Sequence, residues 1–131
     1  MNKSRFTFSS RFRSISCALN GIRILISTQH NAWIHLFATA IIIPAGFYFH
    51  LVRTEWLWII LAVTSVWAAE AFNTAIEYLT DLASPEIHPL AGKAKDVAAG
   101  AVLITAMSAA VIGLLILGPH VCLHFCPKTG P

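Results

Sequence analysis

The sequence predicts an all-α membrane protein with an N-terminal amphipathic surface helix and three transmembrane helices. Of its 131 residues, 56% are hydrophobic and only 11% are charged, whereas soluble domains carry roughly a quarter charged residues. Long apolar segments alternate with short polar ones along the chain. A soluble domain of this size would have to expose much of that apolar surface to water. We therefore expect one membrane domain over residues 1–131.

The surface helix is predicted at about residues 10–28. Its larger apolar residues recur at steps of three and four, so they share one face of a helix, while most polar residues fall elsewhere. These residues are Phe12, Ile15, Leu19, Ile22 and Ile26. A helix with this pattern is typical of one that lies in the plane of the membrane surface.

Three later segments are long enough to cross a hydrocarbon layer of about 30 Å, which takes about 20 apolar residues. The polar stretch 83–96 separates the last two of them and contains Pro85 and Pro89, which forbid an uninterrupted helix across it. The predicted spans are at about residues 32–52, 56–82 and 97–117.

The distribution of Lys and Arg predicts the orientation of the spans. Five basic residues precede the first span and two, Lys93 and Lys95, precede the third, against Arg53 and Lys128 on the other side. Since cytoplasmic segments are enriched in Lys and Arg, the N-terminus and the 83–96 segment are expected in the cytoplasm. The early basic residues suit anionic lipid. No nucleic-acid-binding signature accompanies them, so a nucleic-acid partner is not expected.

The run EAFNTAIEYLTD, residues 70–81, places polar side chains at the end of the second span. Glu70, Asn73, Glu77 and Asp81 recur at steps of three and four and so line one helix face. Counted from Glu55, Glu70 lies roughly 22 Å along the helix, just inside a layer about 30 Å thick, and Glu77 lies about 10 Å further. Ionisable residues at membrane depth are costly and are candidates for function. The alternative is the solvated end of an ordinary span.

This stripe suits a transfer between a membrane-held hydroxyl and a water-soluble donor. Glu70 could act as general base, while Glu77 with Asn73 could hold Mg²⁺, which uses few carboxylates together with substrate phosphates. Lys95 could bind phosphate oxygens, and Asp96 is expected at the start of the third helix. No Walker-type or kinase-type glycine loop is present in the sequence.

The C-terminal segment 119–131 is predicted to be a flexible tail. His120, Cys122, His124 and Cys126 alternate within it, which would put all four side chains on one side of an extended strand. The spacing is not that of a structural zinc site. A metal site or a disulfide between Cys122 and Cys126 remains an alternative to a featureless tail.

The run EAFNTAIEYLTD followed by SPEIHPLAGKAKDVAAGAVL resembles the small prokaryotic diacylglycerol kinase family, which includes undecaprenol kinases. The resemblance extends from about Arg11 to Gly118. It implies a bacterial inner-membrane lipid kinase that moves the γ-phosphate of ATP to a lipid hydroxyl with Mg²⁺. It also implies a homotrimer whose active sites lie between subunits, on the cytoplasmic side.

The resemblance assigns roles to individual residues. Glu70 would be the general base and would contact the lipid, Glu77 would bind both metal and ATP, and Asn73 would orient the phosphates. Lys95 and Asp96 would contact the phosphates or the ribose. The remaining implied residues are Arg11, Cys17, Glu86 and His88 for ATP, and Asn31, Trp33 and Ala99 for the lipid.

Two departures from the family pattern stand out. Gln29 occupies the position where the family commonly has a second metal-binding Glu, and its carbonyl could still bind Mg²⁺ without adding charge. Cys17 stands where some relatives have an aromatic residue against the nucleotide base. The sequence SPEIHPLA is more similar to the undecaprenol-type relatives than to diacylglycerol kinases, but it leaves both lipids open as the substrate.

Two other functions are compatible with parts of the sequence. A catalytically impaired relative could act as a membrane assembly or regulatory protein, and Gln29 would then be a sign of lost activity. A proton-coupled transporter could use Glu70, but it would need a continuous polar path, and the outer half of each span is apolar.

Overall fold

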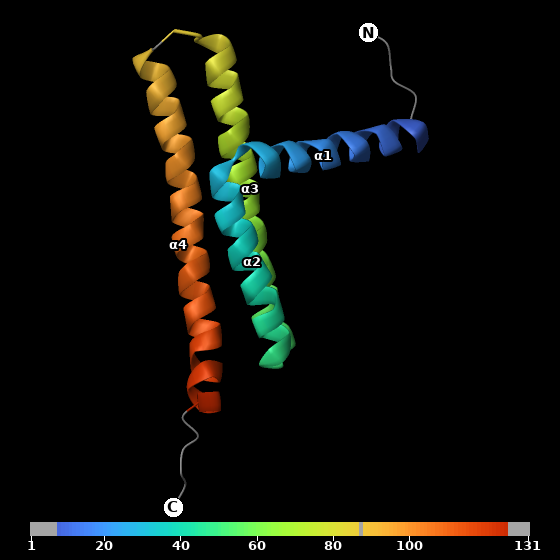
Figure 1. Cartoon of the computed structure of the whole chain (residues 1–131), viewed down its shortest axis with the longest axis vertical. Coiled ribbons are helices and arrows are strands. Elements are labelled where there is room, and N and C mark those ends of the chain that lie inside the picture. The colour runs from blue at the N-terminus through green and yellow to red at the C-terminus, as the bar shows by residue number, and fades with distance from the viewer. Residues whose placement is uncertain (1–7, 87, 126–131) are drawn as a thin grey trace, which may run out of the picture.

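The structure is a computed structural model that describes residues 8–86 and 88–125. This part of the chain contains helices and no strand, which confirms the all-α prediction. A first helix lies crosswise to a bundle of three others (Figure 1). All three bundle helices are long and apolar enough to cross a membrane by length and composition. The helices are α1 (Phe8–Thr28), α2 (His30–Tyr48), α3 (Arg53–Ala83) and α4 (Pro89–Phe125).

The crosswise helix α1 begins two residues before the helix predicted at about residues 10–28 and ends with it. Its apolar face is largely exposed, with Phe12, Ile15, Leu19 and Ile22 each more than half accessible, while Leu25 is buried. Exposed apolar side chains on an amphipathic helix suit contact with lipid rather than with water. One residue in extended conformation, Gln29, separates α1 from α2 and allows the sharp change of direction.

A tight turn joins α2 to α3. Helix α2 ends at Tyr48, four residues before the predicted end of the first span. His50 then adopts the left-handed conformation with φ of 53°, and the N–H of Leu51 donates to the carbonyl of Gly46 at 3.0 Å. Gly46 lies directly against Trp56, since a Cβ on it would be 2.8 Å from the indole ring. The absence of a side chain at this position lets the turn close.

Helices α3 and α4 run side by side for much of their length (Figure 1). The prediction that the third helix starts near residue 97 is wrong, because α4 begins at Pro89. Proline is tolerated at a first helical position, where its missing N–H needs no partner. The ring nitrogen Nδ1 of His88 accepts from the N–H of Leu90 at 3.2 Å, so His88 caps the helix. Asp96 therefore lies two turns inside α4.

Helix α4 also continues past Pro119, so the prediction of a flexible tail from residue 119 is wrong as far as residue 125. Two contacts tie this extension to the rest of the bundle. His120 Nε2 lies 3.0 Å from Glu55 Oε1, and His124 Nε2 lies 3.1 Å from the hydroxyl of Tyr48. Proline inside a membrane helix is tolerated when surrounding groups compensate for the missing backbone bond.

The helical conformation also overturns the extended arrangement expected for the tail. On a helix His120 and His124 share a face, whereas Cys122 points elsewhere. Among the described residues, no group of three or more His, Cys, Asp or Glu could hold a metal ion. Cys122 is exposed and forms no disulfide with another described residue. Cys126 lies outside the described residues, and its disulfide with Cys122 stays a prediction.

Candidate active site

The polar stripe of α3 runs from a buried carboxylate to an exposed one. The side chain of Glu70 has no solvent exposure and Asn73 is 4% exposed, while Glu77 is half-buried and Asp81 exposed. Asn73 and Glu77 touch, because Asn73 Nδ2 donates to Glu77 Oε1 at 2.9 Å. Because Glu70, Glu77 and Asp81 are spaced along one helix face, each lies in a different environment.

The junction of α1 and α2 meets this stripe at Glu77. The Nε2 group of Gln29 donates to Glu77 Oε2 at 3.2 Å, and the hydroxyls of Thr28 and Tyr78 lie 3.0 Å apart. These contacts place Glu77 at the level of the surface helix, and Glu70, seven residues earlier, lies about 10 Å further into the bundle. Beyond this level α3 and α4 continue past α1 (Figure 1).

The residues around Glu77 fit a magnesium ion. The Oδ1 oxygen of Asn73 is buried and has no partner among the described residues. The amide of Gln29 can rotate so that its oxygen replaces its nitrogen toward Glu77, since the two ends of an amide are a matter of assignment. One carboxylate and two amide oxygens leave room for phosphate oxygens, as Mg²⁺ sites commonly do.

The water-side end of the stripe carries an ion pair between α3 and α4. Lys95 Nζ donates to Asp81 Oδ1, and Lys95 is partly exposed while Asp81 is mostly exposed. Asp96 follows on α4 and is exposed. A positive group at this place can meet the phosphates of a soluble donor, since its partner Asp81 lies on the same face of α3 as Glu77.

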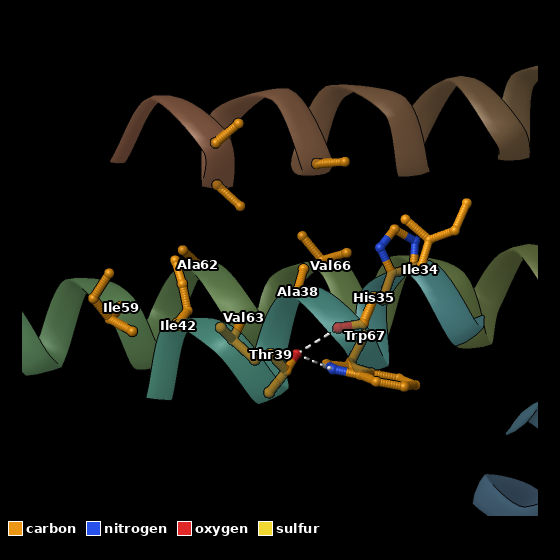
Figure 2. A pocket seen from close by; sticks show the side chains of 13 residues that line it. Ile34, His35, Ala38, Thr39, Ile42, Ile59, Ala62, Val63, Val66 and Trp67 are labelled. Atoms are coloured by element: carbon orange, nitrogen blue, oxygen red, sulfur yellow. Dashed lines mark hydrogen bonds between the residues drawn. The ribbon is translucent and has the colours of Figure 1, made fainter. Parts of the chain in front are cut away.

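An apolar cavity of about 270 Å³ lies between α2, α3 and α4 (Figure 2). Most of its lining is aliphatic, and the polar groups among the lining residues are His35, Thr39 and Trp67. His35 also approaches the polar stripe of α3, since its Nε2 lies 3.8 Å from Glu70 Oε2. The cavity thus ends near the buried carboxylate.

The structure brings three of the predicted residues together, namely Gln29, Asn73 and Glu77, and pairs Lys95 with Asp81. Glu70 is buried further along the same face of α3. The remaining predicted residues are exposed, namely Arg11 and Cys17 on α1, Asn31 and Trp33 on α2, Glu86 and His88 before α4, and Asp96 and Ala99 on α4.

Sequence reasoning missed His35. It lies within the apolar run of the first span, six residues after Gln29. An ionisable side chain inside a span is itself a signal of function, but the run contains other polar residues. Only the packing of α2 on α3 shows that this one faces Glu70.

These features define a helical membrane protein with a polar cluster where the bundle meets the crosswise helix α1. The sequence profile of the prokaryotic diacylglycerol kinase family matches residues 16–117. An undecaprenol kinase of Bacillus subtilis is 40% identical over 108 residues, which cover 82% of this chain and 88% of that protein.

Two diacylglycerol kinases are also similar. That of Synechocystis sp. is 38% identical over 109 residues, 81% of this chain and 61% of that longer protein. That of Haemophilus influenzae is 30% identical over 91 residues, 70% of this chain and 77% of its own length. The chain belongs to the prokaryotic diacylglycerol kinase family. It is a membrane lipid kinase, a phosphotransferase with an alcohol group as acceptor.

Proposed function

We propose that this kinase transfers the γ-phosphate of MgATP to the hydroxyl of a membrane lipid, either diacylglycerol or undecaprenol. The products are phosphatidate or undecaprenyl phosphate. One observation carries the proposal: Glu70 is fully buried with unpaired oxygens, and Glu77, which contacts Gln29 and Asn73, lies two helical turns nearer the surface helix.

The cost of burying Glu70 supports a role in chemistry. A buried polar group without a partner costs about 1–3 kcal/mol, and a charged one costs more. Nothing in the fold requires an acid there, since the neighbouring cavity is lined mainly by aliphatic side chains. A substrate hydroxyl would give the carboxylate the hydrogen bond that it lacks.

The role proposed for each residue follows from its position along the bundle. Glu77, Asn73 and the carbonyl of Gln29 would hold Mg²⁺, which neutralises charge on the phosphates when bound. Lys95 would bind phosphate oxygens from α4. Glu70 would accept the hydroxyl proton as the lipid oxygen attacks phosphorus. The cavity between α2, α3 and α4 would take part of the lipid's apolar chain.

Replacement of the proposed base is the direct test. Glu70→Gln keeps the shape of the side chain but removes its capacity to accept a proton, so we expect turnover to fall about 10²- to 10⁴-fold. ATP binding, measured by equilibrium dialysis in detergent, should be unchanged. Glu55→Gln on the same helix is the matched control and should keep activity. Normal turnover of Glu70→Gln would remove Glu70 from the mechanism.

The lipid is identified by a separate assay. Radiolabelled ATP is mixed with the purified protein and mixed micelles that contain either diacylglycerol or undecaprenol, and labelled lipid is separated by thin-layer chromatography. The similarity to an undecaprenol kinase over 82% of the chain favours the isoprenoid alcohol. Labelled phosphatidate with no labelled undecaprenyl phosphate would reverse that preference.

A catalytically impaired relative is the second candidate, and Gln29 is the observation that favours it. In this structure the amide of Gln29 donates to Glu77, the carboxylate proposed to bind metal. A protein that folds, binds no ATP and phosphorylates neither lipid would support this candidate.

We also propose a homotrimer in the bacterial inner membrane, with the N-terminus and the active site on the cytoplasmic side. The apolar faces of the spans support it, because most of each spanning segment is unburied within one chain and must meet lipid or other copies. Chemical cross-linking in membranes followed by gel electrophoresis would test it, with a ladder that stops at three copies expected.

A further inference from the structure

Glu70 of α3 and His35 of α2 face each other with buried and unpaired polar atoms. Glu70 has no solvent exposure, and the side chain of His35 is 14% exposed. Within the described part of the chain, neither oxygen of Glu70 has a hydrogen-bond partner, and the same is true of His35 Nε2. Two such groups side by side are an arrangement that a protein core normally avoids.

The separation of the two groups is too long for a hydrogen bond and suits a shared oxygen. His35 Nε2 and Glu70 Oε2 are 3.8 Å apart, whereas hydrogen bonds of these types have lengths of about 2.7–3.0 Å. An oxygen atom at hydrogen-bond distance from both would form a bent bridge. A hydroxyl can do this, since it donates one hydrogen bond and accepts up to two.

The position of His35 is fixed by contacts with residues of both helices. Thr39 Oγ1 donates to the backbone carbonyl of His35 at 2.7 Å, and Trp67 Nε1 donates to Thr39 Oγ1 at 3.2 Å. Both bonds are drawn in Figure 2. The Trp67 ring also packs edge-on against the His35 ring, with centroids 6.4 Å apart. Trp67 precedes Glu70 by nearly one turn of α3, so this packing sets His35 relative to the carboxylate.

We propose that His35 is a second catalytic residue, which holds the lipid hydroxyl between its Nε2–H and Glu70. This inference rests on the proposed function and names the group that positions the acceptor. The hydroxyl donates to Glu70 Oε2 and accepts from His35 Nε2, in the tautomer that carries the proton on Nε2. Its second lone pair is directed at the phosphorus.

The step balances with groups already named. The lipid oxygen forms a bond to the γ-phosphorus while the bond between that phosphorus and the bridging oxygen of ADP breaks, and ADP leaves with the electron pair. The hydroxyl proton moves to Glu70. The N–H of His35 stabilises the negative charge that develops on the lipid oxygen, which is most valuable in a site shielded from water.

Two substitutions at His35 test the inference. His35→Ala removes the donor and should lower kcat about 10²- to 10³-fold, the usual loss for one such donor, with KM for ATP unchanged. His35→Gln keeps an N–H near the same place and should recover at least tenfold of that loss. Added imidazole should restore part of the activity of His35→Ala, but not of Glu70→Gln. His124→Gln, at the other end of the bundle, is the matched control and should behave as the unmodified protein.

A binding measurement gives a readout that does not depend on turnover. The protein is labelled with ¹⁵N-histidine in bilayers, and the Nε2 signal of His35 is assigned by its loss in His35→Gln. Addition of undecaprenol or diacylglycerol without ATP should shift that signal, whereas the same lipid with its hydroxyl methylated should not. A merely structural histidine would respond equally to both lipids.

The outcomes separate this inference from the function on which it rests. If the unmodified protein phosphorylates neither lipid, the proposed function fails. If it is active and His35→Ala stays within twofold of it, the role of His35 is overturned. Loss of ATP affinity in both His35 variants, or a signal that does not respond to the lipid hydroxyl, would overturn it as well.

Discussion

Gln29 lies where the junction of α1 and α2 meets the polar stripe of α3. It is the single residue between the surface helix and the first span, and its amide contacts Glu77 at 3.2 Å. A carboxylate at this place would face Glu77 closely. Two facing acids repel each other until a cation lies between them, so the charge at residue 29 should control the affinity for metal.

Gln29→Glu is therefore expected to bind Mg²⁺ more tightly. Half-maximal activation should occur at a Mg²⁺ concentration several-fold below that of the unmodified protein, because a second anionic ligand is added. The measurement is a titration of kinase activity with Mg²⁺ at saturating ATP. Gln29→Asn, which shortens the side chain but adds no charge, is the control. An identical titration curve for Gln29→Glu would show that residue 29 does not bind the metal.

The spacing of the polar residues along α3 was predictable from the sequence, whereas the residues that each of them contacts were not. Rise per residue alone places Glu70 about 10 Å from Glu77, and the structure shows the first buried and the second half-buried. The contact of Glu70 with His35 depends on the rotation of α2 against α3. Mostly apolar helices such as α2 leave that rotation undefined, because several faces would pack equally well.

Lys95 and Asp81 join the ends of α3 and α4 outside the predicted hydrocarbon layer. Both groups are accessible to water, Asp81 to 65%, and an exposed ion pair contributes only about 0.2–1 kcal/mol to stability. The value of Lys95 should therefore lie in phosphate binding. A charge-assisted hydrogen bond to phosphate is worth about 1.5–3 kcal/mol.

Lys95→Ala is expected to weaken ATP binding roughly ten- to a hundredfold, which is the same energy expressed as affinity. Asp81→Ala removes the same ion pair and leaves the positive charge, so ATP affinity should stay within about threefold. Fluorescent-nucleotide titration of both variants gives the comparison. Equal losses in the two variants would mean that the ion pair, and not the phosphate contact, is what matters.

The turn between α2 and α3 depends on Gly46. A Cβ at this position would lie 2.8 Å and 2.9 Å from two ring atoms of Trp56 and 3.1 Å from Leu51. Gly21 on α1 is the natural comparison, because a Cβ added there would meet no other atom within 4 Å. The two glycines are in helices, so their helix propensities are alike.

Gly46→Ala should destabilise the protein by about 1–3 kcal/mol, the usual cost of overpacking. Gly21→Ala should be neutral or stabilise it by up to about 1 kcal/mol. Unfolding by SDS in mixed micelles, followed by circular dichroism, measures both. Equal stabilities for the two variants would show that Trp56 moves aside at little cost.

Helix ends were the least predictable part of the fold. Helix α4 begins eight residues before the apolar segment and ends eight residues after it, since polar residues can extend a helix into water without a change in its pattern. Its start is set by Pro89 and the cap from His88. Its far end is set by contacts of His120 and His124 with other helices, which no local pattern reveals.

At the scale of the whole molecule, a single chain buries little of the apolar surface of its three-helix bundle. Large apolar side chains such as Phe37, Leu103 and Leu114 are more than half exposed. In a membrane such faces are covered by lipid or by other subunits. The polar groups of the proposed active site are gathered on the side of α1, so the two ends of the molecule differ in chemistry.

The orientation of these two ends in the membrane can be tested with the cysteines. Cys17 lies exposed on α1, and Cys122 lies exposed near the far end of α4. Since Lys and Arg are concentrated before the first span and in the segment before the third, we expect α1 in the cytoplasm and Cys122 outside it.

The test uses two variants that each retain a single cysteine. In intact spheroplasts a membrane-impermeant maleimide should label the protein that retains Cys122 and not the one that retains Cys17. After lysis both should react, which controls for thiol accessibility. The site would face a compartment without ATP if the pattern were reversed, because Glu77 and Lys95 lie toward the same end of the bundle as α1. Labelling of Cys17 before lysis would therefore contradict both the orientation and the use of cytoplasmic ATP as donor.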